Sequence, residues 1–316
     1  MTAYILRRLV LLLPVVLIVG VVVFALVHLT PGDPAAVILG DRATAEDIER
    51  LRDQLGLNDP LPLQFVRWIG GAVRLDFGES IFLGESVTSA LAGRLQPTLL
   101  LTLYALLIQL GIGIPAGVLA AVRHNSPIDR LLTIMSISGA AIPTFFLGIL
   151  LILFFGVQLH LLPSGGYEPI IEDPAAHFRL MLLPAFALGF SSAGLLARLV
   201  RSSMLDVMRE DYVRTAFAKG LPGRAVVMRH ALRNAMIPAL TVIGTSVGAL
   251  LGGAVVTETV FTIPGMGRLV EQSIARRDYP IIQGAIMLIA VTYVLVNLLV
   301  DLLYVYIDPR VRLRGD

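Results

Sequence analysis

The sequence has no cysteine, a single lysine, a single tryptophan and few charged side chains. The absence of cysteine excludes a disulfide scaffold, cysteine-ligated zinc, iron–sulfur clusters, c-type haem and a thiol nucleophile. Only 15% of the 316 residues are charged and 56% are hydrophobic, whereas a soluble domain has about 25% charged residues. This composition excludes a disordered chain and disfavours a soluble enzyme. The net charge of +2 points to no particular partner, and no nucleic acid is expected to bind.

Recognisable catalytic motifs are also missing. The sequence contains no Gly-x-x-x-x-Gly-Lys-Ser/Thr phosphate loop, no His-Glu-x-x-His and no Gly-x-Ser-x-Gly. Lys219 is followed by Gly220 in a predicted loop and lacks a strand–loop–helix context. The histidines show no ligand spacing and are expected at surfaces or interfaces; they are His28, His124, His160, His177 and His230. We therefore expect no catalytic residue, no metal, no cofactor and no enzymatic activity, so any ATP hydrolysis must be supplied by another polypeptide.

Long uncharged apolar runs are what the sequence does contain. A helix needs about 20 apolar residues to cross the hydrocarbon core of a bilayer. Six runs are long enough: Leu9–Leu29, Leu95–Val122, Leu131–Val157, Leu180–Ala197, Ala235–Thr257 and Tyr279–Val300. The first follows Arg7-Arg8, as a signal peptide would. We interpret it as a retained anchor, because it exceeds the usual h-region of about 7–15 residues and ends without a small-residue cleavage site.

The distribution of arginine predicts the orientation. With the N-terminus inside, the cytoplasmic pieces hold 15 basic and 7 acidic residues, and the external pieces hold 10 basic and 16 acidic ones. The cytoplasmic pieces are 1–8, 123–130, 198–234 and 301–316, and the external ones are 30–94, 158–179 and 258–278. Because basic residues accumulate in cytoplasmic loops, we expect an all-α integral membrane protein with six transmembrane helices and both termini inside. Its predicted parts are the N-terminus with the first span (1–29), an external segment (30–94) and a five-helix core (95–316).

Two hydrophilic segments have helical patterns. In the external segment, Ala43–Leu55 is predicted as an amphipathic helix with Thr44 as N-cap, and Leu63–Val73 as a second helix. This segment either lies along the outer membrane surface, caps the bundle or simply packs on the spans. In the basic loop at 206–234, we expect one helix over Asp206–Ala218 and, after a break at residues 220–223, another from Arg224 toward the fifth span.

Glycines in two spans allow close helix contacts. Gly244, Gly248 and Gly252 follow one another at four-residue spacing in the fifth span, so another backbone can approach that face. A contact with a partner subunit and tight packing within the chain both fit. For Gly113 and Gly117 in the second span, packing within the chain is the favoured interpretation. No chain of acidic or histidine residues lies in mid-bilayer, which gives little support to ion-coupled transport.

The loop at 206–234 carries the most specific pattern. Asp211-Tyr212-Val213-Arg214-Thr215-Ala216-Phe217-Ala218-Lys219-Gly220-Leu221 is followed by Arg229-His230-Ala231-Leu232-Arg233-Asn234-Ala235-Met236-Ile237-Pro238. It resembles the EAA loop of ATP-binding-cassette importer permeases, more narrowly the first (B-type) subunit of the dipeptide/oligopeptide branch. Other segments resemble the same branch: Leu29–Pro34, Leu162–Gly166, Glu258–Gly267, Arg277–Pro280, Asp301–Tyr304 and Asp308–Arg310.

This resemblance implies a type I ABC importer permease fold and a coupling loop that docks on an ATPase. The implied coupling residues are Asp211, Arg214, Thr215, Ala216, Lys219, Gly220, Leu221 and Arg229. One departure is clear: where the family reads Glu-Ala-Ala and, after three residues, Gly, this chain has Arg214, Thr215, Ala216 and Gly220. Any role of the family's glutamate therefore falls to another subunit. Gly244, Gly248 and Gly252 are the candidates for subunit packing.

The resemblance further implies a permease in the bacterial cytoplasmic (inner) membrane. Its expected partners are a second permease of the same family, two P-loop ATPase subunits, an external substrate-binding protein and membrane lipid. The expected cargo is a di- or oligopeptide, and nickel chelates, glutathione or another small solute are the alternatives within the family. A stand-alone secondary transporter or channel is the alternative from a different class; it predicts buried titratable groups or internal repeats, and neither is visible.

Overall fold

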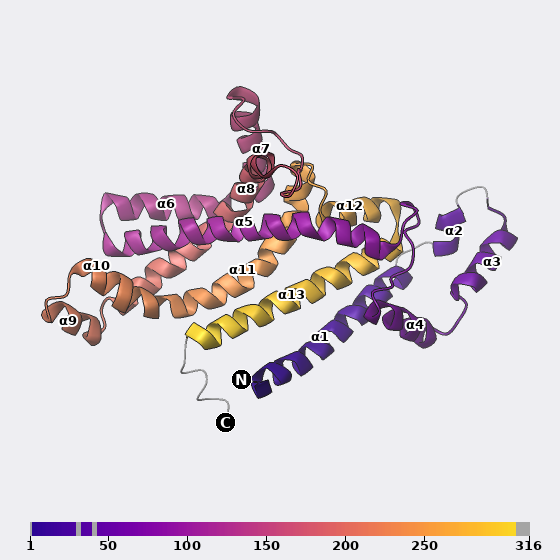
Figure 1. Cartoon of the computed structure of the whole chain (residues 1–316), viewed down its shortest axis with the longest axis horizontal. Coiled ribbons are helices and arrows are strands. Elements are labelled where there is room, and N and C mark those ends of the chain that lie inside the picture. Colours follow the sequence, from indigo (N-terminus) through magenta and orange to yellow (C-terminus); the bar gives the residue numbers. More distant parts are fainter. Residues whose placement is uncertain (1, 30–32, 40–42, 308–316) are drawn as a thin grey trace. The chain divides into compact units, whose positions relative to one another are not determined.

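The computed structural model describes residues 2–29, 33–39 and 43–307, and these residues are almost entirely helical (Figure 1). The elements in chain order are α1 (Thr2–Leu29), α2 (Pro34–Leu39), α3 (Ala45–Leu55), α4 (Leu61–Val73), α5 (Val87–Val122), α6 (Pro127–Ala141), α7 (Thr144–Leu151), the π-helix η1 (Ile152–Gln158), α8 (Pro174–Val207), α9 (Asp211–Ala218), α10 (Gly223–Ala225), the π-helix η2 (Val226–Ala231), α11 (Leu232–Val260), α12 (Met266–Arg276) and α13 (Tyr279–Ile307). In these ranges the extended pairing is one isolated bridge between Glu79 and Ser86.

The chain divides into two compact units. The first comprises residues 1–96 and 268–295, and the second comprises residues 97–267 and 296–316. The loop at 206–234 and the segments Leu162–Gly166 and Glu258–Gly267 all belong to the second unit.

Within the described part of the chain, four helices are long and apolar enough to cross a membrane. They are Val87–Val122, Pro174–Val207, Gly223–Val260 and Tyr279–Leu299. A fifth span results if the bent pair Pro127–Ala141 and Thr144–Gln158 is counted as one. The first expected span lies within α1, in which the part Leu13–Leu29 is apolar. The prediction of an all-helical membrane protein is therefore confirmed.

The third apolar run, expected as one helix over Leu131–Val157, is instead two helices that meet at 104°. The chain turns at Ile142, which has an extended conformation (φ −77°, ψ 123°), and resumes its helix after Pro143. Proline lacks an N–H and disfavours the α conformation in the residue before it. The uncharged run continued through this break, so hydropathy alone did not reveal it.

In the second unit α8 is the central helix, and it packs against α6, α7 and α11. Small residues bring the backbones together. A Cβ on Gly117 would lie 2.6 Å from the Ala197 carbonyl oxygen, and one on Gly113 would lie 3.0 Å from that of Ala193. The prediction that these two glycines of α5 pack within the chain is confirmed. Gly194 approaches α6 in the same way, since its Cβ would lie 2.2 Å from the Ser136 carbonyl oxygen.

In the first unit, the expected helices of the external segment are present as α3 and α4, and α2 was not predicted. Thr44 caps α3, and its hydroxyl hydrogen-bonds the Asp47 carboxylate, which lowers the pKa of Asp47. Helix α4 contacts α1, where the rings of Phe24, Phe65 and Trp68 cluster. At least α4 therefore packs on the first apolar helix, which agrees with one of the three placements left open for this segment.

Two local expectations were wrong. Helix α8 runs on through Val207, and a turn at Met208–Glu210 separates it from α9, so Asp206–Ala218 is not one helix. The break is made by the extended backbone of Glu210 (φ −68°, ψ 145°), and no glycine or proline signals it.

The second wrong expectation is that His177 lies at a surface or interface. His177 is fully buried, and its ring nitrogens lie 3.1 Å from the Tyr104 hydroxyl and 2.6 Å from the Glu168 carbonyl oxygen. These two bonds make the buried position possible.

Candidate functional site

The loop between α8 and α11 forms a small helical protrusion at the end that these two helices share (Figure 1). It contains α9, the short α10 and the π-helix η2, which leads without interruption into α11. Gly223–Val260 is thus a single helical stretch of 38 residues. Any displacement of the protrusion acts directly on two of the long apolar helices, because both are its immediate neighbours in the chain.

One face of α9 is buried against the chain itself. Val213 and Ala216, three residues apart, are buried together with Val226 of η2. Val207 and Met208, at the end of α8, pack against the same cluster. Residues three apart share a face of a helix, so these contacts fix the rotation of α9 about its axis and decide which residues face outward.

The end of α9 is fixed by Gly220. The N–H of Gly220 donates to the Phe217 carbonyl at 2.9 Å, and the N–H of Leu221 donates to the Ala216 carbonyl at 3.4 Å. This pair of bonds is a Schellman motif, and it requires the left-handed conformation that Gly220 adopts (φ +78°). The predicted break at residues 220–223 is confirmed, with Pro222 immediately before α10.

The outward face of α9 carries apolar and basic groups together. Tyr212 is 41% exposed, Phe217 is 45% exposed and Leu221 is 39% exposed. Asn234 donates a hydrogen bond to the Tyr212 hydroxyl at 2.6 Å, which ties α9 to the start of α11. Large apolar side chains exposed next to charged ones are typical of protein interfaces. We call this set the α9 surface; it comprises Tyr212, Arg214, Phe217, Lys219 and Leu221.

Charged side chains of this loop are exposed to solvent. Arg214 lies 3.5 Å from Asp211, but both side chains are mostly exposed, and such surface pairs contribute little to stability. Thr215 donates to the Asp211 carbonyl at 2.9 Å within the helix. Arg229, on η2, is exposed. Guanidinium groups in such positions can bind carboxylates of a partner through two parallel hydrogen bonds.

The structure places one implied coupling residue, Ala216, on the inner face of α9 and two aromatic residues on its outer face. Ala216 packs in the chain's own cluster with Val213 and Val226 and is only 6% exposed. Sequence reasoning did not single out Tyr212 and Phe217. The sequence alone did not show which face is outward, because Phe217 lies four residues after Val213 and could have shared its buried face.

A second constellation joins two of the segments that resemble the family. The Gly166 N–H donates to the Phe261 carbonyl at 2.8 Å, so Leu162–Gly166 lies against Glu258–Gly267. A Cβ on Gly165 would lie 2.6 Å from the same carbonyl oxygen. The neighbouring Thr262 is left-handed (φ +54°). The glycines in this motif therefore serve close backbone packing.

Glu258 is the polar centre of this constellation and is completely buried. Its carboxylate accepts hydrogen bonds from the Thr98 hydroxyl at 2.5 Å and from the Gly267 N–H at 2.8 Å. Thr98 in turn accepts from the Met266 N–H at 2.8 Å. The motif thus joins the end of α11 to α5 and to the start of α12. We call this set, with Leu162–Gly166, the Glu258 junction.

The first unit also contains a buried, hydrogen-bonded carboxylate, that of Asp278 in the segment Arg277–Pro280. Asp278 is buried and accepts hydrogen bonds from the Ser80 hydroxyl and, at 3.4 Å, from the backbone N–H groups of Ile81 and Phe82. It fixes the loop before α5 to the start of α13. Thr30–Gly32 and Asp308–Arg310 lie outside the described residues, as do the side chains of Asp301–Tyr304.

The three glycines of α11 have different environments. Gly244 is buried and Gly248 partly buried, while a Cβ on Gly252 would meet no atom within 4 Å. The close approach to α8 is made by Gly253, whose Cβ would lie 2.8 Å from Leu188. Four residues turn a helix by roughly 400°, so a four-residue spacing drifts around the axis. Gly252 therefore presents an open surface.

Several polar groups elsewhere in the second unit are paired, whereas the buried Tyr167 hydroxyl has no hydrogen-bond partner among the described residues. Arg201 makes two hydrogen bonds to Asp129, at 2.7 and 2.8 Å, and joins α8 to the start of α6. Ser246 of α11 donates to Gln109 of α5 at 3.1 Å. Among the residues that the structure describes, no group of three or more histidine or acidic side chains could hold a metal. These features define a helical membrane component with an exposed helical loop between α8 and α11.

Comparison with known proteins gives the family. Residues 113–313 match the family described as the binding-protein-dependent transport system inner membrane component, and residues 1–102 match its N-terminal family. A probable peptide ABC transporter permease protein of Sinorhizobium fredii is 47% identical over 312 residues, covering 99% of this chain and all of that protein. The glutathione transport system permease protein GsiC of Escherichia coli is 45% identical, with 99% of both chains covered.

A solved structure agrees with the fold. An inward-facing structure of the MetNI methionine ABC transporter matches 69% of this chain and 96% of its own chain, with a TM-score of 0.58 at 18% identity. The chain belongs to the family of binding-protein-dependent transport system inner membrane components. It is a permease subunit of an ABC importer and resides in the inner membrane.

Proposed function

We propose that the chain forms, with a second permease of its family, the translocation path for di- or oligopeptides that a substrate-binding protein delivers. In this proposal it has six transmembrane helices, both termini inside, and the type I importer arrangement. Its parts are 1–29, the external segment 30–94 and the core 95–316. The loop at 206–234 then lies in the cytoplasm, and the segments 30–94 and 158–179 face the binding protein.

The observation that carries this proposal is the construction of α9. Its inner face is buried on Val226 and on the end of α8, and its outer face exposes Tyr212, Phe217 and Leu221 beside basic groups. A helix that is rigidly held and leaves such side chains exposed is suited to seat in a cleft of a soluble partner. Two P-loop ATPase subunits, one for each permease, are the partners we propose. When they close on ATP, α9 must move with them and displace α8 and α11.

The proposal of a peptide cargo is based only on the names of related proteins. The Sinorhizobium fredii protein is named for peptides and the Escherichia coli protein for glutathione, which is itself a small peptide. Nickel chelates and other small solutes are the remaining candidates. Gly244, Gly248 and Gly252 are proposed for the contact with the second permease, and the open surface at Gly252 is the part of this stripe that suits it best.

Affinity purification tests the assembly. The tagged chain is purified in mild detergent, and the proteins that accompany it are identified by mass spectrometry. A second permease of the family and one or two P-loop ATPases are expected. Recovery of the chain alone, or only as a homo-oligomer, under conditions that preserve membrane complexes would contradict the importer assembly and favour a stand-alone transporter.

The cargo needs a separate assay. The purified assembly is placed in liposomes with its binding protein, and uptake of a labelled dipeptide is measured with ATP inside. Competition by unlabelled tripeptide, glutathione or a nickel chelate then ranks the candidate cargoes. We expect peptides to compete most strongly. ATP hydrolysis by the assembly without any uptake of the labelled dipeptide would refute the peptide assignment while leaving the importer intact.

A further inference from the structure

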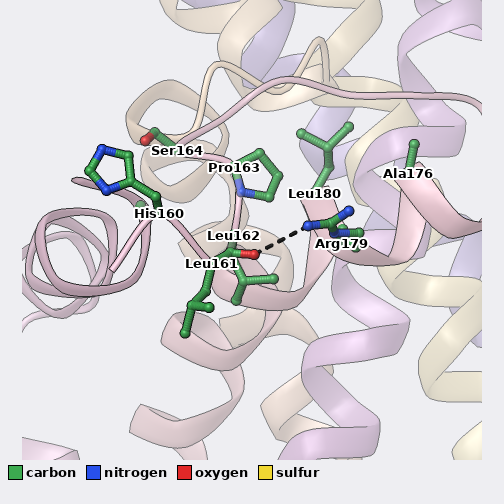
Figure 2. A pocket seen from close by; sticks show the side chains of 9 residues that line it. His160, Leu161, Leu162, Pro163, Ser164, Ala176, Arg179 and Leu180 are labelled. Carbon is green, nitrogen blue, oxygen red and sulfur yellow. Dashed lines mark hydrogen bonds between the residues drawn. The ribbon is translucent and has the colours of Figure 1, made fainter. Parts of the chain in front are cut away.

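The second unit contains an open hollow of about 500 Å³ between the end of η1, the loop that follows it and the first turns of α8 (Figure 2). Its walls are mostly apolar, and they include Leu161, Leu162, Pro163, Ala176 and Leu180. The polar side chains that line it are Arg179, His160 and Ser164. Ser164 also belongs to the Glu258 junction, whereas Arg179 and His160 belong neither to that junction nor to the α9 surface.

Arg179 is the charged group of this hollow. One of its terminal nitrogens donates to the Leu161 carbonyl at 3.3 Å, the bond dashed in Figure 2. A guanidinium has five N–H donors, so this single bond positions the group and leaves donors for a ligand. The ion pairs found among the described residues do not include Arg179. Its charge is therefore available to an anion.

The position of Arg179 along the chain indicates what kind of anion. Arg179 directly precedes the apolar run Leu180–Ala197 of α8. Arginines at the end of an apolar helix lie at the boundary between hydrocarbon and water. In an inner-membrane protein, a guanidinium at this boundary is at the depth of the phospholipid phosphates.

The surroundings of the hollow add the second half of the argument. Leu161 lines the hollow and is exposed, and so are large apolar side chains that neighbour the lining residues in the sequence: Val157, Leu159, Phe178 and Leu182. A small soluble anion gains nothing from these side chains, whereas a ligand with a long hydrocarbon chain buries them. The cation and the adjoining apolar surface together match a molecule with a phosphate head and an acyl tail.

The backbone around the hollow has an unusual conformation at several residues. The π-helix η1 ends beside it, and a Cβ on Gly156 would lie 2.6 Å from the Ser164 hydroxyl. His160 has a left-handed conformation (φ +52°), which is uncommon for a residue other than glycine. π-helices and strained residues gather at functional sites, and here both shape the same hollow.

We propose that this hollow binds a phospholipid, with the Arg179 guanidinium on the headgroup phosphate and an acyl chain along the exposed apolar side chains of α8 and of residues 157–161. The phosphate accepts a bidentate pair of hydrogen bonds from the guanidinium, the geometry that arginine favours with phosphate. A bound lipid here braces η1 and its loop against α8. The site does not depend on the cargo or on the ATPase partners.

Native mass spectrometry of the full-length chain tests the site. The delipidated protein is titrated with dioleoylphosphatidylglycerol, with inorganic phosphate and with dioleoylglycerol, which has the tails but no phosphate. We expect one retained molecule of the phospholipid and none of the other two at the same concentrations. Arg179→Gln should weaken retention about tenfold, the effect of losing a charge-assisted hydrogen bond, and Arg179→Lys should have a smaller effect.

Arg74→Gln is the matched control, because Arg74 is an exposed arginine in the external segment and does not line the hollow. It should leave retention unchanged. Ala176→Phe fills the hollow without altering charge and should abolish retention of the phospholipid. This variant tests the site independently if Arg179→Gln fails to fold. Equal retention by Arg179→Gln and Arg74→Gln would overturn the proposal. Competition by inorganic phosphate would assign the site to the free anion instead, and displacement by a dipeptide would assign it to the cargo path.

Discussion

Two regions of the second unit resemble the same family and are built in opposite ways. In the Glu258 junction the side chains and glycines are used within the chain: the carboxylate accepts from Thr98 and Gly267, and Gly165 packs on Phe261. In the α9 surface the chain uses only the inner face, and Tyr212, Arg214 and Phe217 are exposed. The first region holds the helices together, and the second is available to another protein.

The two family-like segments therefore differ in purpose: one stabilises the fold of the chain, and the other is exposed for contact with a partner. A substitution in the Glu258 junction should reduce the amount of folded protein, whereas one on the α9 surface should leave folding intact and reduce association with the ATPase.

Gly267→Ala should cause the largest loss. Its Cβ would lie 2.3 Å from the Val255 Cα, a backbone atom that cannot move aside. Overpacking of this kind costs about 1–3 kcal/mol or more, so the yield of folded, detergent-soluble protein should fall severely. Gly111→Ala is the control: a Cβ there would meet nothing within 4 Å, and alanine in a helix is about 0.5–1 kcal/mol more stable than glycine. Equal yields of the two variants would contradict the packing argument.

Phe217→Asp should leave the yield and the melting temperature of the chain unchanged but reduce the ATPase recovered with it by about tenfold, equivalent to about 1.4 kcal/mol. The reason is that a carboxylate would replace a large apolar group at a desolvated contact. Phe217→Leu retains the apolar character and should retain most of the ATPase. Full recovery of ATPase with Phe217→Asp would remove this residue from the docking surface.

Arg214→Glu and Arg130→Glu make a second matched pair, since both arginines are exposed and only Arg214 belongs to the α9 surface. Arg214→Glu should lower the transport rate per ATP hydrolysed by several fold, because it reverses a charge that faces the partner. Arg130→Glu should not change this ratio. If both variants lower it equally, the effect is one of net charge on the cytoplasmic side and not of docking.

Substitutions of Gly220 should reduce coupled transport to different degrees. Its left-handed conformation (φ +78°) costs a residue other than glycine about 1–2 kcal/mol, and asparagine tolerates it best. Proline cannot adopt it and also lacks the N–H that donates to Phe217. Coupled transport should therefore fall in the order Asn, Ala, Pro, with insertion in the membrane unchanged. A Gly220→Pro variant with normal uptake would show that the end of α9 need not be fixed.

The long helices and their place in the membrane could be predicted from the sequence, because segments buried in lipid are long and uncharged. The bend at Ile142–Pro143 was not predicted, although Pro143 was its signal. The separation of α8 from α9 could not have been predicted, since the extended residue there is Glu210 and not a glycine or proline. These cases show that hydropathy predicts which segments lie in the membrane better than it predicts where a helix is interrupted.

For the site, the sequence identified the loop but not its faces. It placed Gly220 correctly at the end of a helix, whereas Ala216 proved to be an inward contact and Phe217 an outward one. Which face is buried depends on Val226, a residue of η2 that only the fold brings to α9. The pairing of Leu162–Gly166 with Glu258–Gly267 was likewise beyond sequence reasoning, because the two segments are about 90 residues apart.

Site-specific cross-linking tests the central claim most directly, and the absence of cysteine makes a single introduced thiol unique. Phe217→Cys, Ala216→Cys and Val256→Cys are each expressed with the partner subunits and treated with a short cross-linker in native membranes. Phe217→Cys should give a cross-link to the P-loop ATPase. Ala216→Cys, which faces inward, and Val256→Cys, exposed near the Glu258 junction, should give none. A cross-link from Ala216→Cys or Val256→Cys but not from Phe217→Cys would contradict the assignment of the α9 surface as the ATPase-docking site.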